Sequence, residues 1–337
     1  MRSVTKRYLA VTLLLTLPPC ALGQALKLRT TLAGSDDHLS AIALSHDGKT
    51  LVSVSHGYDR ERGLKRWGDF RVWDVETAEI LSAFQGHDND VYSLALGPDG
   101  LTLASADSQG TILLWSLADQ RVRSSHAVGG HSATLAFSAD GKKLGAASQA
   151  TILICDIATG LTRTVSHRGR LDRMAFSPDL GWVATACHQD VDILDSATGK
   201  IRRTLPDHHG TAMPMSVSAD GKILAVDVSK DDEDLGYHSE IVLWDVATGT
   251  ERTNLKGIGY CHQLALIEDG KRLVVLTETK FRSEFYELRV LEAATGKSSP
   301  SVQFKKNQRP YHLSLSGDGK TAAVACADGS ICVFDVP

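Results

Sequence analysis

The chain has 337 residues, 42% of them hydrophobic and 23% charged, and its formal net charge at pH 7 is −4. This composition is ordinary for a soluble globular protein. The mild acidity, together with the lack of any Lys/Arg run longer than two residues, argues against nucleic acid or an anionic membrane surface as the partner.

The first 23 residues have the pattern of a secretory signal peptide. Three basic residues within the first seven positions precede an apolar run, Leu9–Leu17. Ala21-Leu22-Gly23 then places small residues at positions −3 and −1 of a cleavage site before Gln24. The apolar run is too short to span a bilayer as an anchor. We therefore expect cleavage without membrane insertion, and export to the periplasm or the extracellular space.

Two other fates of the N-terminus stay open. Cys20 could carry a lipid, although the Pro-Pro before it is unlike the small residues of lipid-attachment sites, and the segment could be retained as an anchor. Removal of residues 1–23 takes away three positive charges and no negative ones, so the net charge changes from −4 to −7. The predicted mature chain, residues 24–337, is expected to form one domain.

The stretch from Gly86 to Ser116 has the pattern of one structural repeat. Strands are predicted at Val91–Leu96, Leu101–Ser105 and Thr111–Leu117, the first two separated by the turn Pro98-Asp99-Gly100. Short apolar runs punctuated by Gly, Pro, Asp and Ser are typical of consecutive antiparallel hairpins. Because one such sheet cannot bury both of its faces, a single copy would be unstable.

Seven copies of this repeat follow one another. The aspartate of the first turn recurs as Asp47, Asp99, Asp140, Asp179, Asp220, Asp269 and Asp318. The third strand ends at Asp74, Ser116, Asp156, Asp195, Asp245, Glu292 and Asp335. From each strand end to the next turn aspartate the distance is 23 to 26 residues, whereas from turn to strand end it ranges from 16 to 27. A four-stranded repeat of roughly 40 to 45 residues is the signature of a propeller blade.

The repeats resemble those of the WD40 family over the entire mature chain. The resemblance is carried by Trp73-Asp74, Trp244-Asp245 and Gly86-His87. Degenerate versions of the Trp-Asp pair are Trp115-Ser116, Cys155-Asp156 and Phe334-Asp335. Each motif is weak, but seven repeats in phase are strong. The resemblance implies an exported, bacterial-type member of the family with an all-β fold, a seven-bladed β-propeller of four-stranded antiparallel blades.

In WD40 blades a His, a Ser or Thr, a turn Asp and the Trp form a buried hydrogen-bond network. In the second repeat the resemblance assigns these roles to His87, Ser105 and Trp115, with Gln109 where the family has Asp. The seventh repeat keeps Asp328-Gly329 but not the His and Trp. No repeat is complete by this comparison, so we expect periodic strand packing to supply most of the stability.

The two ends of the sequence predict how the ring closes. In the seventh repeat the third strand ends at Asp335, so this repeat does not supply the outer strand of its own blade. The segment Leu26–Leu32 alternates as a strand should. We expect it to pair with Ser330–Asp335 and to close a monomeric ring, which removes exposed strand edges.

The mature sequence keeps five cysteines: Cys155, Cys187, Cys261, Cys326 and Cys332. An odd number without regular spacing does not describe a disulfide framework. All five fall in predicted strands, where the expected role is that of a small buried hydrophobic residue. Cys326 and Cys332 flank the last hairpin turn, and a disulfide between them stays open.

Almost all length variation lies between the second and third strands of repeats one, five and six. The three insertions are His56–Asp69, Ser229–Ser239 and Thr277–Glu287. The family resemblance places them on one face of the ring, where enlarged loops commonly carry function. Their aromatic and charged residues include the types enriched at interface hot spots. Candidate partner-binding residues are Tyr58, Arg60, Arg62, Arg66, Trp67, Tyr237, His238, Phe281, Phe285 and Tyr286. The alternative is that these hairpins pack on one another and expose only solvated charge.

No catalytic or metal-binding motif is recognised. The sequence has no Gly-x-Ser-x-Gly elbow and no His-Glu-x-x-His, and His167 and His208-His209 lack partners at zinc-ligand spacing. The acidic run Asp231–Asp234 permits calcium, but calcium loops usually interleave their ligands with Gly and carbonyl groups, so a solvated loop is preferred. We expect no cofactor.

Two functions from different classes remain. The leading hypothesis is a non-catalytic exported WD40 propeller that acts as a protein-interaction scaffold through the face carrying the three insertions. The alternative is a propeller enzyme, or a small-ligand or metal-binding propeller, similar to lactonases or quinoproteins. Its site would be assembled from several blades at the mouth of the channel.

Overall fold

The computed structural model describes residues 24–337 except 34–37, 60–63, 131–132, 172, 188–189, 207–210, 233–235 and 280–284. Within strands it leaves out the side chains of 57–67, 150, 168–172, 187–189, 207–213 and 230–237. The predicted signal peptide, residues 1–23, lies outside the described part, so its cleavage stays a prediction.

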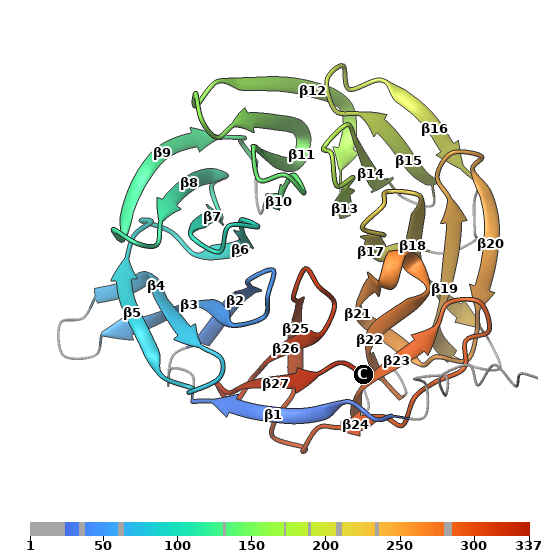
Figure 1. Cartoon of the computed structure of the whole chain (residues 1–337). Coiled ribbons are helices and arrows are strands. Elements are labelled where there is room, and N and C mark those ends of the chain that lie inside the picture. The colour runs from blue at the N-terminus through green and yellow to red at the C-terminus, as the bar shows by residue number, and fades with distance from the viewer. Residues whose placement is uncertain are drawn as a thin grey trace, which may run out of the picture.

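Seven antiparallel sheets form a ring around a central axis, as predicted (Figure 1). Blade 1 consists of β2 (His38–Leu44), β3 (Thr50–Asp59), β4 (Leu64–Asp74) and β5 (Ile80–Gln85). Blade 2 consists of β6 (Val91–Leu96), β7 (Thr102–Asp107), β8 (Thr111–Ser116) and β9 (Arg121–Ala127). Blade 3 consists of β10 (Thr134–Phe137), β11 (Lys143–Asp156) and β12 (Thr162–Leu171). Blade 4 consists of β13 (Arg173–Phe176), β14 (Trp182–Cys187), β15 (Asp190–Asp195) and β16 (Ile201–Leu205).

The remaining blades complete the ring. Blade 5 consists of β17 (Thr211–Val217), β18 (Ile223–Asp232), β19 (Gly236–Asp245) and β20 (Thr250–Leu255). Blade 6 consists of β21 (Tyr260–Ile267), the 3-10 turn η2 (Glu268–Gly270), β22 (Arg272–Glu278), β23 (Tyr286–Glu292) and β24 (Val302–Gln303). Blade 7 consists of β25 (Pro310–Leu315), β26 (Thr321–Cys326), β27 (Ile331–Asp335) and the N-terminal strand β1 (Lys27–Leu32).

Blade 3 has three named strands because β11 takes the places of two. Its first half, residues 144–147, pairs with β10, and its second half, residues 149–155, pairs with β12. The two halves therefore occupy the second and third positions that separate strands hold in the other blades.

The ring closes where the sequence predicted. The strand β1 pairs antiparallel with β27, from Lys27 opposite Asp335 to Leu32 opposite Ile331. Arg29 of β1 binds Asp335, as Arg202 binds Asp195 in blade 4 and Arg252 binds Asp245 in blade 5. Strand β1 thus reproduces a contact that an outer strand makes within other blades. At Asp195 the hydrogen bonds from Arg202 and Thr198 lower the pKa to about 2.

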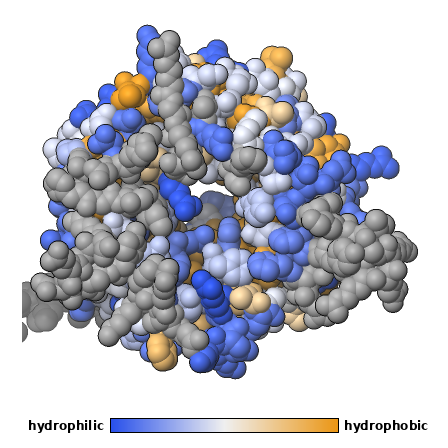
Figure 2. All heavy atoms as spheres, turned by 180° about the vertical axis from the view of Figure 1, so that it is seen from behind, coloured by the Kyte–Doolittle hydropathy of each residue, from blue (hydrophilic) through white to orange (hydrophobic). Residues whose placement is uncertain are grey.

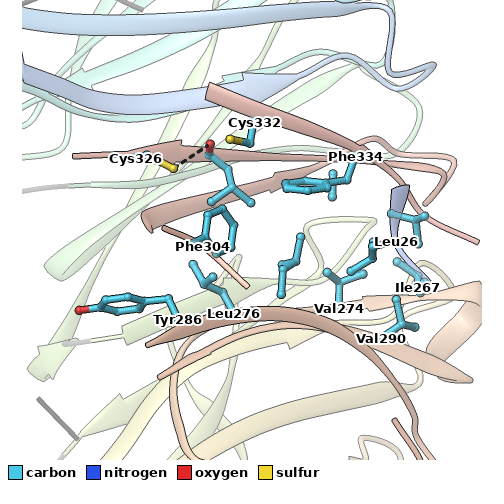
Figure 3. Close-up of a cluster of buried hydrophobic side chains, with 14 residues drawn as sticks. Leu26, Ile267, Val274, Leu276, Tyr286, Val290, Phe304, Cys326, Cys332 and Phe334 are labelled. Carbon is cyan, nitrogen blue, oxygen red and sulfur yellow. Dashed lines mark hydrogen bonds between the residues drawn. The ribbon is translucent and has the colours of Figure 1, made fainter. Parts of the chain in front are cut away.

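The hydrophobic core consists of layers between neighbouring blades. The layer between blades 6 and 7 contains Leu276, Phe304 and Phe334, and Leu26 extends it from the N-terminal segment (Figure 3). The layer between blades 1 and 2 includes Phe70 and Trp115. Because each layer takes side chains from two blades, no blade buries both faces on its own, as the repeat argument requires.

Small side chains allow the innermost strands to approach each other. The next-to-last residue of the innermost strand is Ala or Ser in six blades, and in blade 6 an Ala stands one position earlier: Ala43, Ala95, Ala136, Ala175, Ser216, Ser314 and, in blade 6, Ala265. At two of these positions the serine hydroxyl accepts a hydrogen bond from the neighbouring blade. Leu44 N donates to Ser314 Oγ at 3.0 Å, and Leu266 N donates to Ser216 Oγ at 2.9 Å.

In five blades a serine and the turn aspartate fix the connection between the first two strands. In blade 1 Ser45 Oγ donates to Asp47 Oδ1 at 2.7 Å, and Gly48 follows with a φ of 68°. The same Ser-to-Asp bond recurs at Ser138, Ser177, Ser218 and Ser316. The Ser45 hydroxyl and the Lys49 backbone N–H lower the pKa of Asp47.

Two further motif aspartates fix turns in the same way, Asp74 at the end of a third strand and Asp328 between the second and third strands of blade 7. Asp74 Oδ1 accepts hydrogen bonds from the backbone N–H groups of Glu76 and Thr77 at 2.9 and 2.8 Å. Asp328, at the last hairpin, accepts from Ser330 N and Ser330 Oγ at 3.0 and 2.6 Å. Both residues therefore have structural roles.

The insertions are extensions of two-stranded ladders. In blade 5 the pairing of β18 with β19 continues to Asp232 opposite Gly236, and in blade 1 that of β3 with β4 continues to Asp59 opposite Leu64. In blade 6 the pairing reaches Glu278 opposite Tyr286. We call the face that carries these hairpins and the connections between blades the insertion face. Among the described residues, no helix is long and apolar enough to span a membrane.

The cysteines of the described side chains are buried, as predicted, at Cys155, Cys261, Cys326 and Cys332. All four are free thiols in the structure. Cys326 and Cys332 lie in the core layer between blades 6 and 7 (Figure 3). A hydrogen bond from the Cys326 thiol lowers the pKa of Cys332 to about 7.

Replacement of a core residue in the closing strand should destabilise the whole ring. Leu32 is fully buried whereas Leu28, in the same strand, is 51% exposed. We expect Leu32→Ala to lower the free energy of unfolding by about 2–5 kcal/mol and Leu28→Ala to change it by less than about 0.5 kcal/mol. Urea denaturation measures both. Equal effects would contradict the closing role of β1.

Candidate functional site on the insertion face

The insertion face carries a group of polar and aromatic side chains where blades 7, 1 and 2 meet. We call it the rim cluster, and its members are His38, Ser40, His56, Asp90, Tyr92 and Tyr311. The strands β2, β6 and β25 begin on this face and β3 ends there, because the strands of a blade alternate in direction. From behind the view of Figure 1, the ring shows a central hollow bordered mainly by hydrophilic residues (Figure 2).

Two histidine rings form the centre of the rim cluster. His38 and His56 are register partners on β2 and β3, and their rings stack with centroids 5.4 Å apart. The ring of Tyr311, from blade 7, lies 5.9 Å from that of His38. The Tyr311 hydroxyl donates a hydrogen bond to the Leu39 backbone oxygen at 2.6 Å, and burial raises the pKa of this phenol. These contacts hold blades 7 and 1 in a fixed relation.

His56 also connects blade 1 to blade 2. Its Nδ1 lies 2.8 Å from Ser40 Oγ and 3.7 Å from Asp90 Oδ1. The Tyr92 hydroxyl donates to Asp90 Oδ2 at 3.4 Å, and burial and the Asp90 charge raise the pKa of this phenol. The side chains of His56 and Asp90 stay 31% and 25% exposed, and Tyr92 is 45% exposed. The rim cluster is thus ordered by its own contacts and still open to solvent.

Ser40, His56 and Asp90 are the residue types of a hydrolytic triad, but their arrangement differs from one. In a triad the serine and the carboxylate bind opposite nitrogens of the imidazole, so that the ring can take a proton from one side while the other orients it. Here both oxygens approach Nδ1. The rim cluster therefore has the geometry of a hydrogen-bonded surface and not of a proton relay.

A second polar group lies on the insertion face of blade 6. His262 Nε2, on β21, is 3.1 Å from Glu278 Oε2, on β22. The Tyr260 ring meets the His262 ring edge-on, with centroids 5.1 Å apart. Burial lowers the pKa of His262 although the Glu278 carboxylate opposes that shift.

The blade motif brings its Trp, Ser, His and Asp side chains together in blade 2. Trp115 Nε1 donates to Ser105 Oγ at 2.8 Å, and His87 Nε2 lies 2.7 Å from the same oxygen. On the other side of the ring, His87 Nδ1 lies 3.4 Å from Asp107 Oδ2. Although burial opposes it, backbone N–H groups of Thr111 and Gln109 lower the pKa of Asp107.

The expectation that Gln109 leaves this network incomplete was wrong. Asp107 supplies the carboxylate from the end of β7, two residues after Ser105 and therefore on the same face of the strand. The carboxylate thus comes from two residues earlier in the sequence than the family comparison assumed. Gln109 contributes only its backbone N–H, which donates to Asp107 Oδ1 at 2.9 Å.

Other blades keep parts of the motif. In blade 1 Trp73 Nε1 donates to Ser53 Oγ at 2.9 Å. In blade 5 Trp244 is buried in the same register, but the position of Ser53 and Ser105 is taken by Val226. The motif residues Trp73, Trp115 and Trp244 all contribute to inter-blade core layers.

Comparison with known proteins agrees with this architecture. The WD40 family model (WD domain, G-beta repeat) matches residues 78–116 and 300–335, which include parts of blades 1, 2 and 7. The chain is a seven-bladed β-propeller that matches WD40 repeats in these two segments.

Three curated proteins are similar to parts of the chain, and two of them are named as WD repeat-containing proteins. WD repeat-containing protein SL1-17 of Schistosoma mansoni is 27% identical over 39% of this chain and 44% of its own length. An uncharacterized WD repeat-containing protein of Synechocystis is 32% identical over 42% of each chain. Small ribosomal subunit protein RACK1y of Oryza sativa subsp. japonica is 27% identical over 38% of this chain and 36% of its own length. The chain thus spans less than half the length of these relatives.

Most of the predicted partner-binding side chains of the WD40 propeller fall outside the described part. This applies to Tyr58, Arg60, Arg62, Arg66, Trp67, Tyr237 and Phe281. Their role stays a prediction, although the backbone of Tyr58, Arg66, Trp67 and Tyr237 belongs to the extended ladders of blades 1 and 5.

The structure describes the other three candidates. Phe285 is 68% exposed, and His238 is half-buried in β19. Tyr286 is only 6% exposed and packs with Leu276 and Phe304 in the layer between blades 6 and 7 (Figure 3). Its inclusion in an exposed surface was therefore wrong, because β23 alternates and turns Tyr286 toward the core.

The described residues contain no candidate metal centre. Among them, no group of three or more His, Cys, Asp or Glu side chains is arranged to hold a metal ion. The acidic run Asp231–Asp234, where calcium was the alternative, lies outside the described side chains.

Sequence reasoning missed the rim cluster. Four of its members, Ser40, Asp90, Tyr92 and Tyr311, occupy ordinary repeat positions in first strands or just before them. The available signal was the register of the repeat, which places His38 opposite His56 at the base of the first insertion. A search limited to the inserted residues could not find partners supplied by neighbouring blades.

Two serines at equivalent positions of blades 2 and 1 make different numbers of hydrogen bonds. Ser105 Oγ contacts both Trp115 and His87, whereas Ser53 Oγ, among the described residues, contacts Trp73 alone. We expect Ser105→Ala to lower the free energy of unfolding by about 1–3 kcal/mol and Ser53→Ala by about 1 kcal/mol. Chemical denaturation of both variants provides the measurement, and a larger loss at Ser53 would contradict the network.

Proposed function

We propose that this WD40 propeller is an exported scaffold that binds a protein partner through its insertion face. The observation that carries the proposal is the rim cluster, which presents an open aromatic and polar surface across three blades. It adjoins the base of the first insertion, since β3 contains both His56 and Tyr58.

The physical character of the rim cluster suits a protein partner. Tyr92 and the stacked His38 and His56 offer flat rings with polar edges, which give contact area at a low cost in side-chain entropy. The hydrogen bonds of His56 and Tyr311 fix these rings before binding, so less freedom is lost when a partner docks. A rice relative is named as a small ribosomal subunit protein, that is, a member of an assembly.

A capture experiment tests the surface. Wild type is compared with His56→Ala and Tyr92→Ala, both in the rim cluster. The control is Leu101→Ala, because Leu101 is 55% exposed on the turn at the opposite end of the β6–β7 hairpin. We expect a protein that wild type and Leu101→Ala enrich equally, with at least tenfold less on the two rim variants, as quantitative mass spectrometry would measure.

Two outcomes would contradict this function. Equal enrichment on all four proteins would place the contact elsewhere on the ring. If no protein is enriched by wild type above a bead control, the scaffold function itself is wrong. Matching circular dichroism and melting temperatures ensure that the rim variants remain folded.

Export belongs to the same proposal and rests on residues 1–23 alone. The full chain, expressed in a Gram-negative host, should appear outside the cytoplasm with an N-terminus at Gln24, because the small residues Ala21 and Gly23 precede it. Intact-mass measurement of the exported protein shows this. If the protein stays in the cytoplasm and retains Met1, export is wrong, and the scaffold proposal is unaffected.

A further inference from the structure

Blades 5 and 6 meet in a layer that changes character toward the insertion face. Its apolar part includes Ala225 and Leu243 from blade 5 and Val275 from blade 6. Further along the same strand faces come polar side chains. We call these the inter-blade polar layer, and its members are Asp227, Ser229, Ser239, Cys261, Thr277 and Arg289.

The blade 5 side of this layer is built around Asp227. Asp227 has no solvent exposure, and Ser239 Oγ donates to its Oδ2 at 3.2 Å. Ser239 Oγ in turn accepts a hydrogen bond from Cys261 N of blade 6 at 3.0 Å. The two blades are therefore joined here through a chain that runs from the Cys261 backbone to the Asp227 carboxyl.

The blade 6 side presents Thr277 and Arg289. Thr277 is 1% exposed and is the register partner of Cys261. Arg289 lies on β23, opposite Val275, and its guanidinium donates to the Ile258 backbone oxygen. Burial lowers the pKa of Arg289.

Four atoms of the layer are solvent-inaccessible and have no hydrogen-bond partner among the described residues. They are Asp227 Oδ1, Ser229 Oγ, Thr277 Oγ1 and Arg289 Nε. Buried polar atoms of this kind nearly always have a partner, from the protein or from ordered water. Their occurrence together, on both sides of one interface, calls for a shared partner rather than four separate explanations.

We propose that the inter-blade polar layer is a binding site for internal water, which bridges blades 5 and 6 between Asp227, Ser229, Thr277 and Arg289. The site fits water because it offers both donors and acceptors. Arg289 Nε donates, the two hydroxyl groups do either, and the Asp227 carboxyl accepts. A buried water makes about three such bonds.

The protonation of Asp227 follows from the same surroundings. Among the described residues, the titratable group that interacts with Asp227 is Cys261 of β21, which also lies close enough to Arg289 of β23 to interact with its charge. Burial raises the pKa of Asp227 to about 8, against the opposing effect of the hydrogen bond from Ser239. At neutral pH the carboxyl is protonated and can donate to water as well as accept from it.

This site has a mechanical consequence for the insertion face. Ser229 and Ser239 are register partners at the base of the blade 5 hairpin, and Thr277 lies just before the end of β22, at the base of the blade 6 hairpin. Water shared among them fixes the two hairpin bases relative to each other. The inference does not depend on the proposed function.

Counting long-lived internal waters by oxygen-17 relaxation dispersion tests the site. The variants are Asp227→Leu and the isosteric Thr277→Val, which remove ligands from opposite blades, with Leu101→Ala as the surface control. We expect at least one long-lived water fewer in each site variant than in wild type and no change in Leu101→Ala. Equal counts in wild type and Thr277→Val would overturn the proposal, even if Asp227→Leu fails to fold. So would a crystal structure in which Asp227 Oδ1 binds Arg289 Nε directly.

Stability as a function of pH tests the protonation state. An aspartate in the unfolded chain ionises near the ordinary value of 3.8, whereas folded Asp227, with its pKa raised by burial, holds its proton up to about pH 8. The contribution of Asp227 to the free energy of unfolding is therefore complete below about pH 4. It decreases as pH rises and stops changing above about pH 8. The ratio of the unfolding constants of wild type and Asp227→Asn should rise about tenfold per pH unit between about pH 5 and 8. A constant ratio would show that Asp227 is ionised and overturn its assigned role as a water donor.

Discussion

Each blade of this propeller has two apolar faces, and neither is buried until another blade lies against it. The core layers are shared between neighbours, so the stability of any blade depends on the closure of the ring. Closure rests on β1, which supplies an outer strand, a buried Leu32 and the Arg29–Asp335 contact from the far end of the sequence. A chain built from local hairpins thus depends on one pairing between residues about 300 positions apart.

The two faces of the ring differ in the regularity of their connections. On one face the connections are short turns with repeated Ser–Asp and Asp–Arg contacts, such as Ser45–Asp47 and Asp195–Arg202. On the insertion face the connections vary in length, and the side chains differ from blade to blade. Because the rigid turns already fix each sheet, the opposite ends of the strands are free to carry His56, Tyr92 and the extended hairpins without loss of the fold.

The fold was predictable from sequence because its signal is repeated seven times. Turn aspartates, strand ends and the closing strand Leu26–Leu32 all follow from spacing, and the structure confirms them. Within the insertions, the alternation of apolar and polar residues was less informative about which side chains are buried. Tyr286 was assigned to a surface because it is aromatic and lies in an insertion. Its position in β23, where it pairs with Glu278 of β22, determines instead that its side chain is buried.

The rim cluster could not be predicted in the same way, since it depends on contacts between blades. His56 reaches Ser40 within its own blade and Asp90 in the next connection, while Tyr311 comes from the other end of the chain. A repeat alignment places such residues in equivalent positions but does not say which of them meet. Asp107 illustrates the same limit on a smaller scale, because a family pattern located the carboxylate two residues too late.

The polar layer between blades 5 and 6 shows how this architecture accommodates a departure from apolar packing. In the layer between blades 1 and 2 the polar side chains contact one another, as in the Trp115–Ser105–His87–Asp107 network. At Asp227 the layer is closed to solvent and only partly satisfied by protein groups. Water bound there, as proposed, would join the bases of the blade 5 and blade 6 hairpins through hydrogen bonds that the apolar part of the layer cannot supply. The relative position of these two hairpins would then depend on a polar interface, while the apolar part beneath it holds the blades together.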